Sequence, residues 1–239
     1  MPVDLLNGIY CGPAPDPMTI WLRWNLDPVL LTGLAVAALL LRRSITGVSA
    51  ILVLAVAFVS PLCALSASLF SARVVHHVLL IAVAAPMLAM ARPARKPVSS
   101  AVAFVPSVLA LWIWHLPAAY DLALSNIAVY WIMQLTLLGT AFMYWQAAFH
   151  RQLGLHGPLL ILAGYMQMAL LGAILTFAPF PLYAIHAVAP LAWSFSALAD
   201  QQLGGLIMWV PAGLPFMLFG GLLAHRRWNA LSRQSGQPA

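Results

Sequence analysis

Negative charge is nearly absent from this sequence. The five acidic residues are all Asp, there is no Glu, and charged residues of both signs make up only 7% of the 239 residues. An average soluble domain is about 25% charged. A surface facing water cannot be built from so few charges, which excludes a soluble globular protein and leaves lipid as the solvent.

Cysteines are scarce, and enzyme signatures are missing. The chain has two cysteines, Cys11 and Cys63, which are too few for a disulfide framework. It contains no phosphate-cradling glycine-rich loop, no H-E-x-x-H and no G-x-S-x-G motif. We therefore expect a protein that is not an enzyme.

Hydrophobic residues, in contrast, make up 63% of the chain. A bilayer core about 30 Å thick needs roughly 20 apolar residues per helix, and backbone groups in lipid must pair internally. The apolar runs therefore predict an all-α polytopic transmembrane helix bundle of about seven spans. The predicted spans cover residues 27–41, 45–70, 74–91, 98–114, 126–149, 158–178 and 203–224. Proline interrupts four of them, and each proline predicts a kink or an early helix end: Pro61, Pro86, Pro106 and Pro211.

The basic residues fix an expected orientation. Nine of the eleven fall in alternate loops, at Arg42, Arg43, Arg92, Arg95, Lys96, Arg151, Arg226, Arg227 and Arg233. The positive-inside rule assigns these loops to the cytoplasm. The sequence thus predicts an outer N-terminal segment (1–26), a membrane domain (27–225) and a cytoplasmic polar tail (226–239). Because the cations are spread between apolar runs, the expected partner is a lipid bilayer and not a nucleic acid.

One stretch, residues 179–199, is apolar enough to be an eighth span. Counting it would move Arg226 and Arg227 to the outer side, against the charge rule, and three prolines interrupt it. We predict instead an outer loop that lies at the membrane interface, anchored by Tyr183 and Trp193.

Candidate ligands for a soft metal gather on the predicted outer side. Imidazole with thiolate or thioether groups suits copper, and Cu(I) in particular. His76 and His77 are about 100° apart on a helix, so they cannot easily share one ion. The alternative is that these side chains only pack or cap helix ends. The candidates are His76, His77, His115, Cys63 and Met208, with His186 in the outer loop.

Four further polar residues are predicted to support such a site. Arg73 directly precedes the third span, where it could pair with Asp200 or Asp121, bind an anionic group, or extend to the interface. Asp200 and Gln201 would orient ligands or close the site from the last outer loop.

Three segments carry a resemblance to a known family. The first is Ser60-Pro61, then LFSARVVHHVLL at residues 69–80, then Ala85-Pro86. The second is WHLP at residues 114–117, with Tyr120 and Asp121 after it. The third and most specific is DQQLGGLIMWVP at residues 200–211. Together they resemble the CtaG family of cytochrome c oxidase assembly proteins, the multi-pass type associated with caa-type oxidases, over about residues 45–225.

The resemblance implies a role in maturing cytochrome c oxidase in the bacterial inner membrane, with oxidase subunits as partners and copper as the metal concerned. His77 matches the second histidine of the family's first motif, and His115 matches the histidine of its W-H-x-P motif. The chain departs from the family pattern at two positions, because Arg73 replaces the first histidine and His76 replaces a glutamine.

Three hypotheses remain open from the sequence. The first is an assembly factor that binds oxidase subunits and presents Cu(I) at the outer face. The second is a transporter of copper or a small solute, for which the mid-span polar residues are few: Gln134, Thr136, Thr140, Gln167 and Thr176. The third is a metal-free scaffold or accessory subunit, associating through small residues that face the lipid, such as Gly204 and Gly205.

Overall fold

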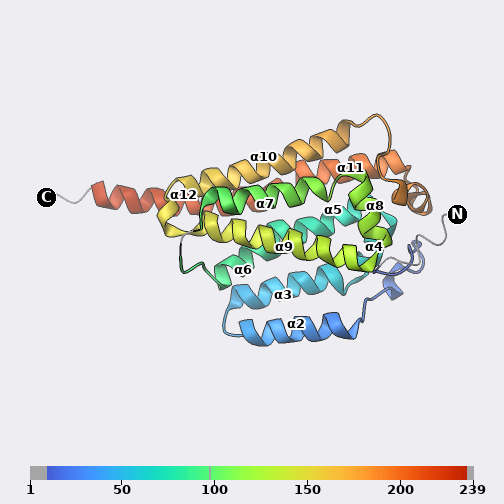
Figure 1. The fold of residues 1–239 in the computed structure, drawn as a ribbon, viewed down its shortest axis with the longest axis horizontal. Coiled ribbons are helices and arrows are strands. Elements are labelled where there is room, and N and C mark those ends of the chain that lie inside the picture. Colours follow the sequence, from blue (N-terminus) through green and yellow to red (C-terminus); the bar gives the residue numbers. More distant parts are fainter. Residues whose placement is uncertain (1–9, 97, 236–239) are drawn as a thin grey trace.

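The computed structural model describes residues 10–96 and 98–235, and this part of the chain is helical without β-strands. The main helices run roughly along one axis, and α12 extends beyond the others at one end (Figure 1). Their bounds are α2 Pro28–Leu41, α3 Ile45–Phe58, α4 Pro61–Ser68, α5 Phe70–Val78, α6 Ala85–Ala91, α7 Ser100–Ile113, α8 Pro117–Ser125, α9 Ile127–Phe149, α10 His156–Phe177, α11 Ala197–Trp209 and α12 Gly213–Ser235.

Four stretches are long and apolar enough to cross a membrane: Phe70–Ala91, Ile127–Phe149, His156–Phe177 and Ala197–Arg233. Two bent pairs, α3 with α4 at 46° and α7 with α8 at 78°, raise the number to six if each pair is one span. The remaining predicted span, the first one at residues 27–41, corresponds to α2, a shorter apolar helix. The prediction of a helical membrane protein is confirmed, whereas the count of seven stays a prediction.

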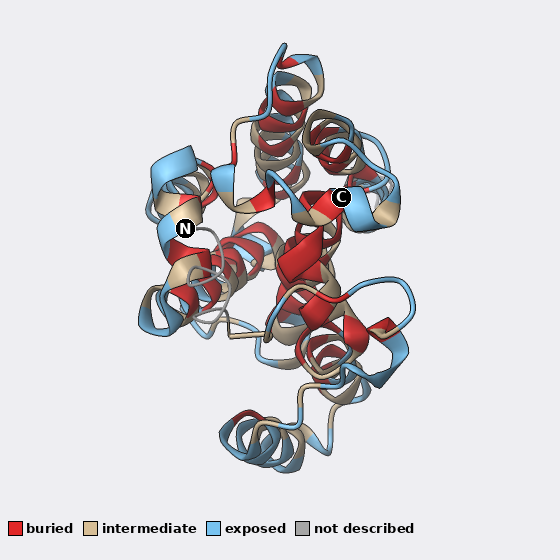
Figure 2. Ribbon diagram, turned by 90° about the vertical axis from the view of Figure 1, so that its right-hand side faces the viewer, coloured by how far each residue is buried: buried red, intermediate tan, exposed pale blue. Residues whose placement is uncertain are grey.

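Burial agrees with a lipid-facing exterior. Buried residues lie toward the centre of the bundle, and α2 is a mainly exposed helix at its edge (Figure 2). Large apolar side chains such as Leu39, Leu52 and Leu135 are exposed. A soluble protein rarely exposes apolar surface so widely, so the exposed surface of this bundle suits hydrocarbon.

Proline positions explain the breaks in the helices. Pro61 begins α4 after the bend, and Pro211 lies in the break between α11 and α12. Pro106 lies inside α7 and does not end this helix. Pro86 follows a π-helical turn, Leu79–Ala84. In π-helical register the residue at position 86 bonds through its backbone N–H to the carbonyl five residues earlier, that of Ile81. Proline has no N–H, so this bond cannot form. The indole Nε1 of Trp145 donates to that carbonyl instead, at 2.8 Å.

Residues 178–196 form no long helix. They contain two 3₁₀ turns, Ala184–His186 and Ala189–Trp193, which supports the loop prediction over an eighth span. Helix α12 continues to Ser235, so much of the predicted polar tail is helical.

Gly204 and Gly205 are buried, which corrects the expectation that they face the lipid. A Cβ on Gly204 would lie 2.5 Å from the ring of Phe70. A Cβ on Gly205 would lie 2.6 Å from the carbonyl oxygen of Gly172 and from the backbone nitrogen of Thr176. These glycines therefore allow α11 to pack closely on α5 and α10.

We expect Gly205→Ala to destabilise the protein by about 1–3 kcal/mol, because the added methyl group meets backbone atoms that cannot move aside. Thermal unfolding of the detergent-solubilised protein measures this effect. Gly139→Ala is the matched control, since nothing lies within 4 Å of a Cβ at that position of α9. Equal unfolding temperatures for the two variants would contradict the close packing.

Candidate functional site

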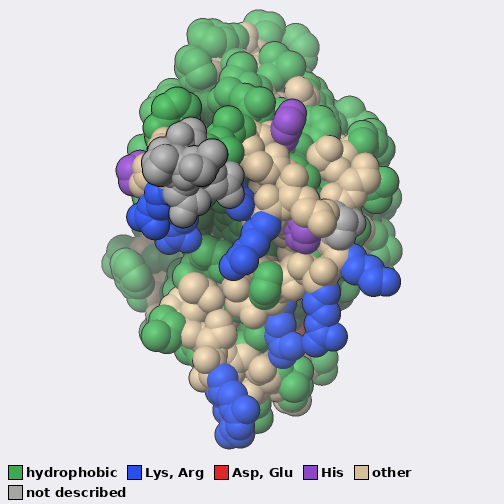
Figure 3. Space-filling model, turned by 90° about the vertical axis from the view of Figure 1, so that its left-hand side faces the viewer, with side chains coloured by type: hydrophobic (Ala, Val, Ile, Leu, Met, Phe, Trp, Pro, Cys, Tyr) green, Lys and Arg blue, Asp and Glu red, His purple; other side chains and the backbone are tan. Residues whose placement is uncertain are grey.

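The two ends of the bundle differ in chemistry. Arginine and lysine side chains gather at one end, which we call the basic end (Figure 3). The opposite end is covered by residues 10–25 and by the loop 178–196, and we call it the capped end. The Trp193 indole joins the two covers by donating to the carbonyl of Pro15 at 3.2 Å. The Ser68 hydroxyl of α4 donates to the same carbonyl at 2.9 Å and holds the first cover to the bundle.

The loop 178–196 folds inward at the capped end. Tyr183 is buried, stacks on Phe70 with ring centroids 4.6 Å apart, and donates its hydroxyl to the carbonyl of His115 at 3.0 Å. The predicted role of Tyr183 as a membrane-interface anchor is therefore wrong. Its aromatic ring instead holds the loop against α5 and α7.

His186 has a structural role within this loop. Its Nε2 accepts a hydrogen bond from the hydroxyl of Tyr120 at 2.8 Å, and its Nδ1 donates one to the carbonyl of Ser68 at 3.3 Å. Burial, and secondarily the nearby Arg73 cation, lower the pKa of His186 to about 3. The ring is therefore neutral at pH 7, with both nitrogens already paired.

Asp200 holds the start of α5. Its carboxylate accepts the backbone N–H groups of Phe70 and Ser71, at 2.6 and 3.2 Å, and the hydroxyl of Ser71. Since Leu69 provides no side-chain cap, Asp200 acts as the cap from another helix, α11. It thereby fixes the helix that carries Arg73, His76 and His77.

Asp121 and Gln201 fix the loop 178–196. Asp121 accepts the backbone N–H groups of Ala184 and Ile185, at 3.2 and 3.4 Å. Gln201 accepts the N–H of Leu182 at 2.7 Å. Both residues hold the loop at the capped end, and neither is paired with Arg73.

Arg73 is completely buried, which corrects the possibility that it extends to the interface. Its Nη1 donates to the hydroxyl of Tyr130 at 3.5 Å, and its guanidinium lies over the Tyr130 ring, 5.3 Å from the centroid. Its Nε and Nη2 have no hydrogen-bond partner. The carboxylates of the described residues form other bonds, so the predicted pairing with Asp200 or Asp121 is not formed.

Two histidines beside Arg73 also lack partners. His76 and His77 are buried, with ring centroids 5.7 Å apart, and none of their four ring nitrogens has a hydrogen-bond partner. Both amide atoms of Gln134 are unpartnered as well. Buried polar atoms in native proteins are rarely left unpaired, so this concentration of free donors and acceptors marks a site.

His115 completes the cluster from the end of α7. Its ring centroid lies 6.1 Å from that of His77, and its Nδ1 donates to the carbonyl of Leu111 at 2.7 Å. Because Nδ1 carries the proton of this bond, Nε2 has a free lone pair that can bind a metal. Histidine ligands of metals are commonly oriented by a second contact of this kind. The two histidines that match the family's motifs, His77 and His115, thus lie side by side, which the sequence left open.

The prediction that Cys63 is a metal ligand is wrong. It forms a disulfide with Cys11, with a Cα–Cα distance of 5.3 Å, so it offers no thiolate. Met208 lies where α11 packs on α10, with its Cβ close to Gly172. This disulfide was not predicted, and the one signal for it was that Cys11 and Cys63 are the two cysteines of the chain.

The donor set fits an ion of low coordination number. Within residues 10–96 and 98–235, no three His, Cys or acidic side chains are placed to hold a metal together. Nitrogen ligands lie about 2 Å from a metal, which separates two ring centroids on one ion by roughly 6 Å. The 6.1 Å separation of His77 and His115 is compatible with that arrangement. Cu(I) accepts two nitrogen ligands, so these two residues fit it.

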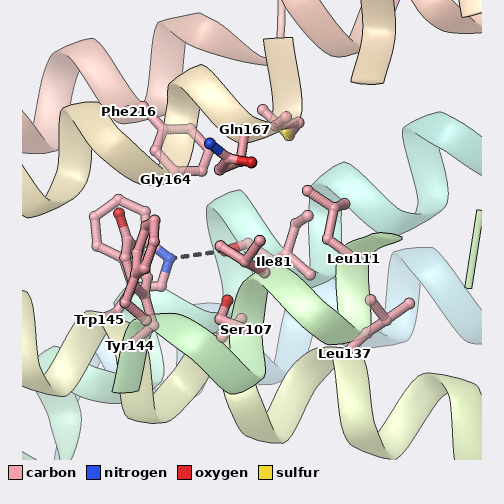
Figure 4. Close-up of a pocket in the computed structure, with 13 residues that line it drawn as sticks. Ile81, Ser107, Leu111, Leu137, Tyr144, Trp145, Gly164, Gln167 and Phe216 are labelled. Carbon is pink, nitrogen blue, oxygen red and sulfur yellow. Dashed lines mark hydrogen bonds between the residues drawn. The ribbon is translucent and has the colours of Figure 1, made fainter. Parts of the chain in front are cut away.

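A small cavity lies deeper in the bundle, between α7, α9 and α10 (Figure 4). Its volume is about 40 Å³, and Ser107, Tyr144, Trp145 and Gln167 carry polar groups in its lining. That is room for very few waters. Leu111, whose carbonyl orients His115, is part of the cavity wall.

These features define a polytopic helical membrane protein with a buried histidine–arginine cluster near one end. The model of the cytochrome c oxidase caa3 assembly factor family matches residues 33–230, and the chain belongs to that family. Neither a curated protein nor a solved structure shows a significant match.

The disulfide predicts how the cysteines respond to a thiol reagent. We expect the denatured, unreduced protein to take up no maleimide, and the reduced protein to take up two labels per chain, one for each cysteine. Intact-mass spectrometry counts the labels. Labelling without reduction would return Cys63 to the set of candidate ligands.

Proposed function

We propose that this protein assists the maturation of a cytochrome c oxidase by holding Cu(I) at the capped end and presenting it to an oxidase subunit. Membership of the assembly factor family supports a role in the maturation of cytochrome c oxidase. The observation that carries the copper step is the unpartnered state of the His77 ring nitrogens beside the oriented Nε2 of His115. Imidazole nitrogen is a suitable copper ligand.

We infer that the capped end faces the outside of a bacterial inner membrane. Two independent observations support this orientation. The basic residues gather at the opposite end, as expected of the cytoplasmic side. The Cys11–Cys63 disulfide lies at the capped end, and disulfides persist in oxidising compartments such as the periplasm.

In this proposal His77 and His115 are the two copper ligands, and His76 lies on the neighbouring face of α5, away from the same ion. Arg73 limits the affinity, since a second positive charge in a buried site is costly. A weakly held ion is easily passed on, which suits delivery. Asp200 and Gln201 keep α5 and the loop in place and do not touch the ion.

A transporter finds little support in the polar residues within the spans. The hydroxyls of Thr136, Thr140 and Thr176 donate to carbonyls of their own helices. Gln167 accepts the indole N–H of Trp112 at 3.3 Å. Four of the five mid-span polar residues are therefore paired with backbone carbonyls or an indole, and Gln134 is the one without a partner. A metal-free scaffold stays the second candidate, and copper measurement separates it from the first.

We expect about one Cu(I) per chain in the purified protein under reducing conditions, lost in His77→Ala/His115→Ala. Metal analysis of the detergent-solubilised protein gives the stoichiometry. His156→Ala is the control, because this exposed histidine lies at the basic end. If wild type and double variant both lack copper, the copper step is wrong and the scaffold is favoured.

The position of Arg73 provides a second test. We expect Arg73→His to bind Cu(I) on the order of tenfold more tightly, because it removes a buried charge and adds a ligand one turn before His77. Competition with a chromogenic Cu(I) chelator measures the affinity. Arg73→Gln separates the two effects, since it removes the charge alone. If Arg73→His and Arg73→Gln bind equally, position 73 does not face the ion.

A further inference from the structure

A groove runs along α12 at the basic end. It lies between α12 and the ends of α6 and α9, and its volume is about 520 Å³. A second hollow of about 460 Å³ adjoins it and shares Ala89, Pro93, Phe149 and Arg151 with the groove. Figure 3 shows this end of the molecule, where Lys and Arg side chains gather.

The groove has an apolar part and a cationic part. The apolar wall is formed by Phe149, Phe219 and Leu222. Arg226 follows Leu222 one helical turn later along α12. Arg151 and Arg227 line the same groove. The order along α12 is thus apolar toward the middle of the bundle and cationic toward its end.

The cations in this groove have no carboxylate near them. The described acidic residues, Asp16, Asp27, Asp121 and Asp200, form their bonds at the capped end. Arg227 donates to the carbonyls of Phe149 and His150, at 3.2 and 3.3 Å, which fixes its guanidinium in the groove. Its Nε is buried without a partner. Within residues 10–96 and 98–235, no carboxylate supplies a counter-charge for these cations.

We propose that this groove binds an anionic phospholipid, with the phosphate between Arg151 and Arg226 and an acyl chain along Phe219 and Leu222. The cations supply charge complementarity for the headgroup, and the apolar wall supplies the surface for the chain. A soluble anion would use the arginines alone and leave the apolar wall uncovered. This inference is independent of copper binding.

The test titrates the full-length protein in neutral detergent with dioleoyl phosphatidylglycerol or dioleoyl phosphatidylcholine, and native mass spectrometry counts bound lipid. We expect phosphatidylglycerol to bind and phosphatidylcholine to bind much more weakly. Arg151→Gln/Arg226→Gln should weaken phosphatidylglycerol binding roughly 30-fold, because the loss of each arginine costs about 1 kcal/mol of binding free energy. Arg227 is left intact because its bonds also join α12 to α9.

Arg42→Gln/Arg43→Gln is the matched control, since it removes the same charge from an exposed turn at the basic end. It should bind phosphatidylglycerol as the wild type does. If both double variants lose the same affinity for phosphatidylglycerol, the lipid responds to surface charge in general, and the proposed site is wrong. Equal binding of the two lipids would overturn it as well. Inorganic phosphate that displaces the lipid at millimolar concentration would show an ion site and contradict the lipid.

Discussion

The bond between Asp200 and the first turn of α5 is the constraint on which the candidate site depends. It joins two segments 130 residues apart in the sequence. Without it the first N–H groups of α5 would be buried without partners, at a cost of about 1–3 kcal/mol each. The carboxylate also fixes the rotation of α5, and so decides that Arg73, His76 and His77 point into the bundle. The glycine at 204 makes the approach possible, because Phe70 occupies the space of its missing side chain.

The cluster balances two opposing tendencies. Histidine nitrogens without partners favour a metal, whereas a buried guanidinium without a carboxylate opposes any further cation. Tyr130 moderates the second effect by offering its ring face and hydroxyl to Arg73. A site of this kind holds a singly charged ion better than a doubly charged one, which agrees with Cu(I) as the proposed cargo.

The places of most helices along the sequence could be predicted, but the direction of a side chain around its helix could not. Apolar runs and loop charges predicted where most helices begin and end, and Pro61 and Pro211 predicted two of the breaks. The inward direction of Gly204 and Gly205, the burial of Arg73 and the inward fold of Tyr183 depend on which helix lies beside which. The Cys11–Cys63 disulfide was missed for the same reason, since its partners lie 52 residues apart and meet only in the folded chain.

The π-helical turn after α5 changes how the sequence of this span has to be interpreted. A helix advances about 100° per residue, and the wider turn at Leu79–Ala84 shifts the phase of everything after it. A helical wheel drawn through Phe70–Ala91 as one ideal helix would therefore assign the wrong faces to the second half. The histidine half and the Pro86 half have separate angular registers. A one-residue insertion or deletion between Leu79 and Ala84 would move the lipid-facing side of α6 while leaving the direction of His76 and His77 unchanged.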